Sequence, residues 1–554
     1  MFPRCRSRRG TTAGAVAAAA MIGLAGCSPS GGGATTGGGI LTIQGDVGNP
    51  TLVADFNPYS LLPPKLGGTN LIYEPLEIPS PINGVYTPFL ATAYTFSDPT
   101  TLVYTIRQGV KWSDGKDFGP ADVVFTFNLL KKYPALDINT VWGAMTGIST
   151  AGNDVTITLK SPDVPFAATI AQTPIVPEHV WSSVSDPVKF ANVNPVGTGP
   201  FTLDKFAPTQ YTLKKNMSYW GAASIAPSQV VFPAQATNQS TNQLDVTSGQ
   251  FDWAYNFLPN VQQTYVARNP AHNVYWFPPG GTIGLYLNLT KAPYSNASFR
   301  KGLSLALDRT TIAKKAVNGY LAAASMSGLI LPNLQQWLDP SLPQQGVVSQ
   351  GRSSALAAFA QAGYTLQSGK LVGSAGAPAS MTIVLPGSFS DWVAAATEVQ
   401  TELGNIGISV TLDTPQFAPY SAAIGGGTFD AAIGGFGGTG SPYTDFNQAL
   451  NSTFATPVNT TTTNNFERFS DPSADQALAA LAAATTDSAQ KQATYKLEHI
   501  MYEQVPVVLM YYGGSWGLFS TKNFTGWPSA ADPYTLPTPY NNAILTVLTH
   551  LHKA

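Results

Sequence analysis

The stretch at 107–128 constrains the fold more than any other, because its residues prescribe a strand, a turn and a helix start in that order. The β-prone run up to Trp112 is followed by S-D-G at 113–115, which offers a side-chain acceptor and then a glycine able to adopt a positive φ. Pro120 suits the first position of a helix, and Asp122 places negative charge in its first turn. None of these residues is an evident nucleophile, base or metal ligand. The stretch therefore predicts α/β architecture and not catalysis.

In these residues the chain resembles the peptide-binding family of bacterial ABC-importer solute-binding proteins, solute-binding family 5, which carries a segment R-x-G-V-x-W/F-x-D-G-x-x-x-x-A-x-D-V. Further blocks fit the same family, in order, from about Leu41 almost to the C-terminus. They are Y-E-P-L at 73–76, P-V-G-T-G-P-F at 195–201, N-M-S-Y-W at 216–220, S-G-Q-F-D at 248–252 and F-R-K-G-L-S-L-A-L-D at 299–308.

The resemblance implies an α/β, two-lobed periplasmic-binding-protein-like fold of type II, the Venus-flytrap form, with an extra N-terminal subdomain. A length of 554 residues also exceeds what one hydrophobic core usually holds, so two or three lobes are expected. The expected parts are a discontinuous lobe I at 40–57, 199–284 and 512–554, an inserted subdomain at 58–198, and lobe II at 285–511.

Local patterns agree with a mixed fold. Strand-like runs punctuated by Gly and Pro alternate with segments in which apolar residues recur at helical spacing. The expected strands include 102–106, 155–159 and 211–213, and the expected helices include 299–317, 353–363 and 392–406.

The composition is unusual in its low content of charge. Charged residues make up 11% of the chain, where about a quarter is typical. The net charge of −2 provides no basic surface for nucleic acid. One hypothesis is that the protein works in an acidic medium, where a surface dependent on carboxylates would titrate; the alternative is a general compositional bias of the source.

The first 27 residues have the form of an export signal. Four arginines precede an apolar run at 13–24 that is too short to span a bilayer, and L-A-G-C closes the segment at Cys27. This ending resembles the lipobox of bacterial lipoproteins, which implies lipidation of Cys27 and anchoring to the membrane. Cys5 would be removed with the signal, leaving no disulfide. The residues at 28–39 predict a flexible Gly/Ser/Thr linker.

Two patterns suggest enzymes. G-G-S-W-G at 513–517 satisfies G-x-S-x-G, and Asp532 and His550 follow in the order of an α/β-hydrolase triad. The residues after Ser515 do not predict the required helix. An extracellular serine hydrolase using Ser515 is therefore the alternative from another class, and no enzyme activity is expected.

The second pattern, G-F-G-G-T-G at 435–440, matches G-x-G-x-x-G after a strand-like run. A dinucleotide site should open a helix directly, whereas Pro442 and Asn/Thr-rich residues follow. We interpret this match as accidental.

Metal and cofactor binding have little support. The histidines at 179, 272, 499, 550 and 552 are scattered along the chain. Some members of the resembled family carry nickel complexes, but no cofactor or metal is expected for this chain.

Aromatic residues beside Gly-, Asn- or Pro-rich turns are the best candidates for lining a ligand cleft, since such clefts combine apolar walls with a few polar groups. The candidate ligand-binding residues are Tyr255, Asn256, Trp392, Phe436, Tyr443, Asp445 and Trp516.

A short peptide-like solute is the expected ligand, and a β-linked oligosaccharide is the alternative. Many peptide-binding members of the family pair an Asp with the α-ammonium of the peptide, but in this chain glycines occupy the corresponding run and Asp445 is the nearest acid. An ammonium buried without a carboxylate is costly. The family as a whole favours a short peptide, whereas S-P-Y at 441–443 and G-W-P-S-A-A-D-P-Y at 526–534 resemble the branch that binds β-linked oligosaccharides.

The function that the resemblance implies is capture of a solute between two lobes, outside the cytoplasm. Hinge closure around the ligand would produce the shape that a membrane permease recognises. The chain lacks G-x-x-x-x-G-K-[ST], so the permease and the ATPase must be other chains. A monomer is expected, with no nucleic-acid partner.

Overall fold

The structure is a computed structural model that describes residues 39–46, 49–60 and 66–554. The predicted signal peptide, the lipidation site Cys27 and the linker up to residue 38 lie outside the described residues. All the described helices and strands belong to one compact unit that reaches to Ala554. Among the described residues, no helix combines the length and the apolar character needed to cross a bilayer.

The first lobe contains two sheets linked by the N-terminal strand. One sheet has the order β1-β10-β9-β8 and the other the order β11-β20-β12. Ile43, directly after β1, bridges to Trp253 in β11. The strands are β1 (Ile40–Thr42), β8 (Phe201–Ala207), β9 (Gln210–Lys215), β10 (Gln229–Pro233), β11 (Trp253–Tyr255), β12 (Asn273–Trp276) and β20 (Gly517–Ser520). The remaining elements are α5 (Gln239–Thr247), α6 (Val261–Thr264), α15 (Ala543–His550), β21 (Phe524–Thr525) and β22 (His552–Lys553).

A subdomain is inserted between β1 and β8. Its antiparallel sheet has the order β4-β5-β7-β6, α1 packs against β6 and β7, and a separate hairpin pairs β2 with β3. Its elements are β2 (Glu77–Pro79), β3 (Tyr86–Pro88), β4 (Ala91–Asp98), β5 (Thr101–Ile106), α1 (Pro120–Lys132), α2 (Val141–Ala144), β6 (Met145–Ala151), β7 (Asp154–Leu159), α3 (Ala167–Ala171) and α4 (Glu178–Trp181).

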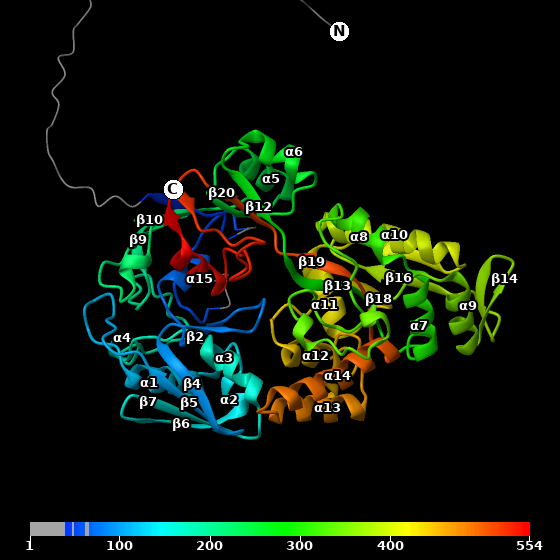
Figure 1. The fold of residues 1–554 in the computed structure, drawn as a ribbon, viewed down its shortest axis with the longest axis horizontal. Coiled ribbons are helices and arrows are strands. Elements are labelled where there is room, and N and C mark those ends of the chain that lie inside the picture. Colours follow the sequence, from blue (N-terminus) through cyan, green and yellow to red (C-terminus); the bar gives the residue numbers. More distant parts are fainter. Residues whose placement is uncertain (1–38, 47–48, 61–65) are drawn as a thin grey trace, which may run out of the picture. The chain divides into compact units, whose positions relative to one another are not determined.

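The second lobe is built on a five-stranded sheet of order β17-β16-β18-β13-β19 (Figure 1). β16 runs parallel to β17 and β18, whereas β13 is antiparallel to β18 and β19. The strands are β13 (Pro279–Leu287), β16 (Ser380–Val384), β17 (Ser409–Asp413), β18 (Ala431–Phe436) and β19 (Val507–Gly514), with a hairpin of β14 (Tyr364–Gln367) and β15 (Lys370–Gly373) apart from this sheet. The helices are α7 (Ala297–Ala306), α8 (Arg309–Val317), α9 (Arg352–Gln361), α10 (Ser390–Asn405), α11 (Phe417–Gly426), α12 (Pro442–Leu450), α13 (Pro472–Ala483) and α14 (Asp487–Gln504).

Local sequence signals predicted several of these elements, and two expectations need correction. The helix α1 begins at Pro120 as predicted, and the Asp122 carboxylate accepts a hydrogen bond from Gly119 N at 3.1 Å. The preceding strand, however, ends at Ile106 and not near Trp112, because β5 runs only as far as its pairing with β4 and β7. The helix expected at 299–317 is two helices, since Asp308 accepts hydrogen bonds from the first turn of α8 and starts it anew.

Two segments cross between the sheets of the two lobes. Trp276 in β12 pairs with Gly517 in β20, and a few residues away Pro279 in β13 pairs with Gly514 in β19. Between these pairs, Ser515 N donates a hydrogen bond to Pro278 O at 2.8 Å. The crossings thus lie near 277–278 and 515–516, whereas the boundaries expected from the sequence fall at 284–285 and 511–512.

Several of the blocks that carry the family resemblance meet at one buried carboxyl group, that of Glu74. Its Oε1 accepts hydrogen bonds from Tyr219 Oη and Trp220 Nε1, both at 3.0 Å, and the Arg107 guanidinium lies 3.9 Å from the centre of the Trp220 ring. A Cβ on Gly197 would lie 1.9 Å from a backbone oxygen of the neighbouring segment, so only glycine fits there. These blocks join the subdomain to the first lobe and are architectural.

Candidate ligand-binding site

A cavity of about 550 Å³ opens where the two crossing segments meet the second lobe. One of its walls consists largely of glycine backbone from three neighbouring strands, β18, β13 and β19. The glycines are Gly280 and Gly281 in β13, Gly435 in β18, and Gly513 and Gly514 at the end of β19. Without side chains, this wall presents mainly N–H and C=O groups to whatever occupies the cavity.

The loop at 437–440 lies close to the backbone of this wall and to the backbone of the β2–β3 hairpin. A Cβ on Gly438, whose φ is +99°, would lie 2.1 Å from Gly280 O, and a Cβ on Gly440 would lie 2.6 Å from Pro81 Cα in the β2–β3 hairpin. Backbone segments can approach this closely only at glycine. The G-x-G-x-x-G run therefore serves backbone packing around the cavity.

The interpretation of this run as accidental rested partly on the absence of a following helix, and that part is wrong. The helix α12 starts directly at Pro442, and Ser441 Oγ accepts a hydrogen bond from Thr444 N at 3.3 Å. Pro at the first helical position and Ser before it are both favourable for a helix start. The first turn also contains the Asp445 carboxylate, which would oppose binding of a phosphate.

Asp445 lies beneath the glycine loop and does not reach the cavity surface. Its side chain is fully buried, and its Oδ1 accepts hydrogen bonds from Thr439 N at 3.1 Å and Thr439 Oγ1 at 2.7 Å. Burial raises the pKa of Asp445 to about 6, and the hydrogen bonds from Thr439 act in the opposite direction. Asp445 thus positions Thr439, which lines the cavity.

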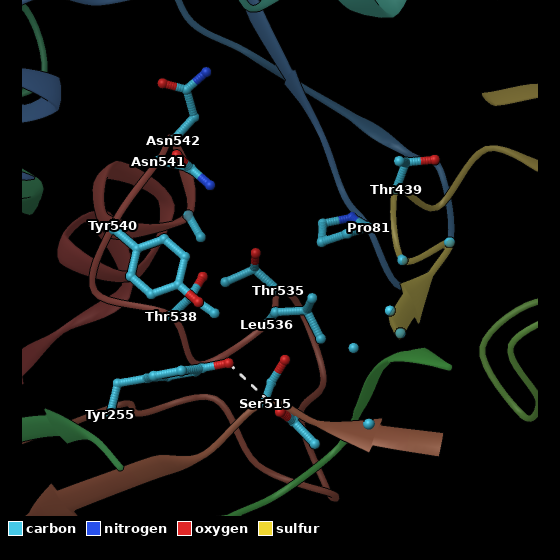
Figure 2. A pocket seen from close by; sticks show the side chains of 18 of the residues that line it. Pro81, Tyr255, Thr439, Ser515, Thr535, Leu536, Thr538, Tyr540, Asn541 and Asn542 are labelled. Carbon is cyan, nitrogen blue, oxygen red and sulfur yellow. Dashed lines mark hydrogen bonds between the residues drawn. The ribbon is translucent and has the colours of Figure 1, made fainter. Parts of the chain in front are cut away.

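The opposite wall comes largely from the first lobe, at Tyr255 and in the segment 535–543. Figure 2 shows Tyr255 and Tyr540 next to each other on this wall, across the cavity from Thr439 and Pro81. The two tyrosine rings meet edge to face at 5.3 Å, and Tyr255 Oη donates to Gly514 O at 3.4 Å. Asn542 is held by a hydrogen bond from Asn70 Nδ2 at 2.9 Å.

The cavity is polar but uncharged. Among the described residues that line it, none is an Asp, Glu, Lys, Arg or His. Its polar side chains are hydroxyls and amides, which include those of Gln172, Thr282, Thr439, Ser515, Thr538 and Asn541. Such a site can exchange hydrogen bonds with a neutral polar molecule, but it offers no counter-ion to a buried ammonium or carboxylate.

Two of the predicted ligand-binding residues, Tyr255 and Phe436, line this cavity. Tyr443 lines a neighbouring cavity of about 310 Å³. Asn256, Trp392, Asp445 and Trp516 are not among the lining residues. Whether any of the seven contacts a ligand stays a prediction.

Trp516 and Trp392 show that a position close to glycines in the sequence does not suffice to predict that a side chain lines the cavity. Trp516 is 9% exposed and packs against Phe257 and Phe277, with ring centres 5.0 and 5.1 Å apart. Trp392 packs against Phe389 and Tyr420. Distant segments of the chain thus supply most of the partners that cover these rings.

Sequence reasoning missed most of the first-lobe wall, which the segment at 535–543 supplies. The run T-P-Y-N-N at 538–542 was the available signal, since it combines an aromatic ring with hydroxyl and amide groups. Gln172, the β2–β3 hairpin and the glycine wall gave no local sign of facing a cavity.

Ser515, Asp532 and His550 do not have the arrangement that the hydrolase alternative requires. The His550 ring stacks on Tyr534 at 4.0 Å and its Nδ1 lies 2.8 Å from Thr546 O, while the residues that follow Ser515 form the strand β20. Asp532 exchanges backbone hydrogen bonds with Ser529. The part of the chain that the structure describes also holds no group of three or more His, Cys, Asp or Glu residues that could bind a metal.

Comparison with known proteins supports a binding role. The chain is 26% identical over 377 residues to the nickel-binding periplasmic protein of Escherichia coli K12, covering 66% of this chain and 69% of that one. It superposes on the periplasmic oligopeptide-binding protein of an ABC transporter from Thermotoga maritima with a TM-score of 0.85 at 24% identity, covering 93% and 99% of the two chains. A second structure of that protein, bound to mannohexaose, gives a TM-score of 0.78 at 25% identity, with coverage of 93% and 98%.

These structures confirm the α/β, two-lobed fold expected from the sequence. Residues 85–460, well over half of the chain, match the sequence profile of the bacterial extracellular solute-binding proteins, family 5 Middle. The members of this family are substrate-binding proteins and not enzymes. The chain belongs to the bacterial extracellular solute-binding proteins of family 5 and is a solute-binding protein of an ABC importer.

Proposed function

We propose that this protein captures a neutral, hydroxyl-rich oligosaccharide between its lobes and delivers it to the permease of an ABC importer. The observation that carries the proposal is the uncharged lining of the 550 Å³ cavity, which combines aromatic rings, hydroxyls, amides and bare glycine backbone. Sugars need hydrogen-bond partners for their hydroxyls and an apolar surface for their ring faces, and do not need a counter-ion.

The relatives support this choice only in part. The Thermotoga maritima protein at 25% identity is known in complex with mannohexaose, although its transporter is described as one for oligopeptides. A short peptide is therefore the second candidate, and the glycine wall favours it, because exposed N–H and C=O groups can pair with an extended peptide. The buried position of Asp445, already engaged by Thr439, weakens the idea that this residue receives the peptide ammonium.

A ligand screen separates the two candidates. We expect β-linked neutral oligosaccharides to raise the unfolding temperature and short peptides to leave it unchanged. A ligand at a hundred times its dissociation constant adds about 2.7 kcal/mol to the free energy of unfolding. Stabilisation by peptides alone would overturn the sugar assignment, and isothermal titration calorimetry would then give the affinity of either class.

Membrane anchoring through Cys27 is part of the proposal. The L-A-G-C sequence supports lipidation, and two acyl chains would hold the protein stably at the membrane. We expect the Cys27→Ser protein to move from the membrane fraction to the soluble extracytoplasmic fraction. Retention of this variant in the membrane fraction would contradict a lipid anchor at Cys27.

Removal of the Tyr540 ring should weaken binding. Tyr540 is 40% exposed at the cavity and contacts Tyr255 edge to face, so its ring has a free surface for a ligand. We expect Tyr540→Ala to raise the dissociation constant of a bound oligosaccharide about tenfold, equivalent to about 1.4 kcal/mol. The matched control is Tyr495→Ala on α14, outside both cavities, which should leave the affinity unchanged.

A side chain at Gly435 should occupy the cavity without disturbing the fold. Gly435 is exposed, lines the cavity, and has no atom within 4 Å of a Cβ built on it. We expect Gly435→Val to leave the free energy of unfolding within about 0.5 kcal/mol of the wild type while the affinity falls about tenfold or more. An unchanged affinity, measured by calorimetry, would place the ligand elsewhere.

A further inference from the structure

A second cavity of about 310 Å³ adjoins the first and shares three lining residues with it, namely Pro79, Gln172 and Thr439. The β2–β3 hairpin separates the two spaces in part, because Pro81 lines the first cavity while Ser80 and Gly84 line the second. Thr439 stands at the junction in an orientation fixed by the buried Asp445. The two cavities therefore adjoin each other at these three residues.

The second cavity has the same chemistry as the first, with a larger aromatic share. Among the described residues that line it, none is an Asp, Glu, Lys, Arg or His. Four aromatic side chains contribute to it, and they are Tyr86, Tyr94, Trp337 and Tyr443. Tyr86 and Tyr94 lie with their ring centres 4.9 Å apart, which makes a continuous aromatic surface on one side.

The two sides of this cavity belong to different parts of the molecule. Tyr86 and Tyr94 come from the inserted subdomain, whereas Trp337 and Tyr443 come from the second lobe. Next to it, the helix α13 of the second lobe contacts the short turn Val164–Phe166 of the subdomain. The crossing segments near 277–278 and 515–516 do not line it. A molecule in this cavity would bridge the two sides at a place apart from the crossing strands.

A ligand shifts an open–closed equilibrium only by the difference in its contacts to the two states. The glycine wall of the first cavity contains the crossing strands themselves, so part of its contact surface is continuous between the lobes. The second cavity has no such continuity, and its two aromatic sides come together only when the subdomain and the second lobe approach each other. Ligand contacts in the second cavity therefore favour the closed state over the open state more strongly than ligand contacts at the glycine wall do.

We propose that the second cavity receives the extension of a linear neutral oligosaccharide whose first units occupy the glycine-walled cavity, and that this extension drives closure of the lobes. The inference rests on the proposed function. Short oligosaccharides then bind without full closure, and longer ones bind more tightly because each added ring contacts aromatic side chains of both sides.

The test is a chain-length series of β-1,4-linked gluco- and manno-oligosaccharides from disaccharide to hexasaccharide, titrated calorimetrically into the purified protein. We expect the affinity to rise at least about tenfold once the oligomer reaches the second cavity. Tyr443→Ala should abolish this rise and lower the affinity for the longest oligomer by a larger factor than the affinity for the shortest binding oligomer. Tyr495→Ala, at a partly exposed position of α14 outside both cavities, should preserve the rise.

A second variant and a second measurement guard against an effect of Tyr443→Ala on folding. Ala168 in α3 lines the second cavity and is only partly buried, so Ala168→Phe should fill the space from the subdomain side and also abolish the rise. Small-angle scattering of the wild type should show a smaller radius of gyration with long oligomers than with short ones.

The outcomes separate this inference from the proposed function. An affinity that is independent of chain length, or that falls equally for short and long oligomers in both variants, overturns the role of the second cavity and leaves the sugar assignment standing. If no member of either series binds, both proposals fail.

Discussion

The free energy of unfolding is expected to fall as the pH rises from about 5 to about 9, and Glu467 should be one of the largest contributors. Glu467 is fully buried, and neither of its carboxyl oxygens has a hydrogen-bond partner in another residue. Burial raises its pKa from 4.5 to about 8, against the lowering effects of its own backbone N–H and of Arg468. Urea unfolding at a series of pH values measures the effect.

The direction follows from proton binding. Because the folded protein holds the Glu467 proton more tightly than the unfolded chain does, the contribution to stability is complete below about pH 4.5. It declines as the pH rises and is lost above about pH 8. The raised pKa corresponds to about 5 kcal/mol of unfolding free energy at this one site.

A conservative substitution isolates this residue. Glu467→Gln cannot ionise, so we expect it to match the wild type near pH 5 and to be more stable than the wild type near pH 9. Glu178→Gln, at an exposed position of α4, is the matched control and should follow the wild-type curve. A Glu467→Gln curve with the full wild-type slope would contradict the assignment.

Other buried carboxyl groups should also make the free energy of unfolding fall as the pH rises. Burial raises the pKa of Glu498 to about 8 and that of Glu74 to about 7, while hydrogen bonds from Asp339 N to Glu498 and from Trp220 and Tyr219 to Glu74 lower it. Asp339 itself behaves oppositely, because hydrogen bonds from Ser341 and His499 outweigh burial and hold its pKa low. The balance predicts greatest stability on the acid side of neutrality, which agrees with the hypothesis of an acidic medium. A curve that peaks near neutral pH and collapses below pH 4 would contradict that hypothesis.

Gly438→Ala should abolish high-affinity binding. A Cβ at this position would lie 2.1 Å from Gly280 O, and the φ of +99° is unfavourable for any residue with a side chain. The loop at 437–440 must then move away from β13, which removes the shape of the glycine wall and displaces Thr439. We expect the dissociation constant of a bound oligosaccharide to rise at least about a hundredfold, equivalent to about 2.7 kcal/mol.

The control for this variant is Gly435→Ala in the same wall. Nothing lies within 4 Å of a Cβ there and its φ is not positive, so the free energy of unfolding should stay within about 0.5 kcal/mol of the wild type. Gly438→Ala should in addition lower the free energy of unfolding by about 1–3 kcal/mol through backbone strain. Wild-type affinity in Gly438→Ala, determined by calorimetry, would show that the ligand does not depend on this loop.

Local chemistry determined which parts of the fold were predictable. Pro120 and Asp122 start α1 through interactions within a few residues, so the sequence shows them directly. The end of β5 at Ile106 depends instead on its pairing with strands β4 and β7, and no residue near Trp112 reveals this.

The same distinction applies to the candidate site. Tyr255 was recognisable beside its turn, and it does line the cavity. The burial of Trp516 depends on Phe257 and Phe277, and Tyr540 reaches Tyr255 from a distant part of the chain, so neither could be placed without the fold. The uncharged character of the cavity likewise emerges only when its separate segments come together.

The two sides of the cavity contribute different groups to ligand recognition, because the glycine wall presents mainly main-chain groups and the other side presents side chains. Main-chain groups are the same whatever the residue, so substitutions in this wall leave its main-chain hydrogen-bonding groups unchanged and chiefly reduce the space. New ligand preferences are therefore expected mainly from the first-lobe segment at 535–543 and from the subdomain, whose side chains face the same space. Redesign of the ligand range can be confined to those segments, and the crossing strands can be left as they are.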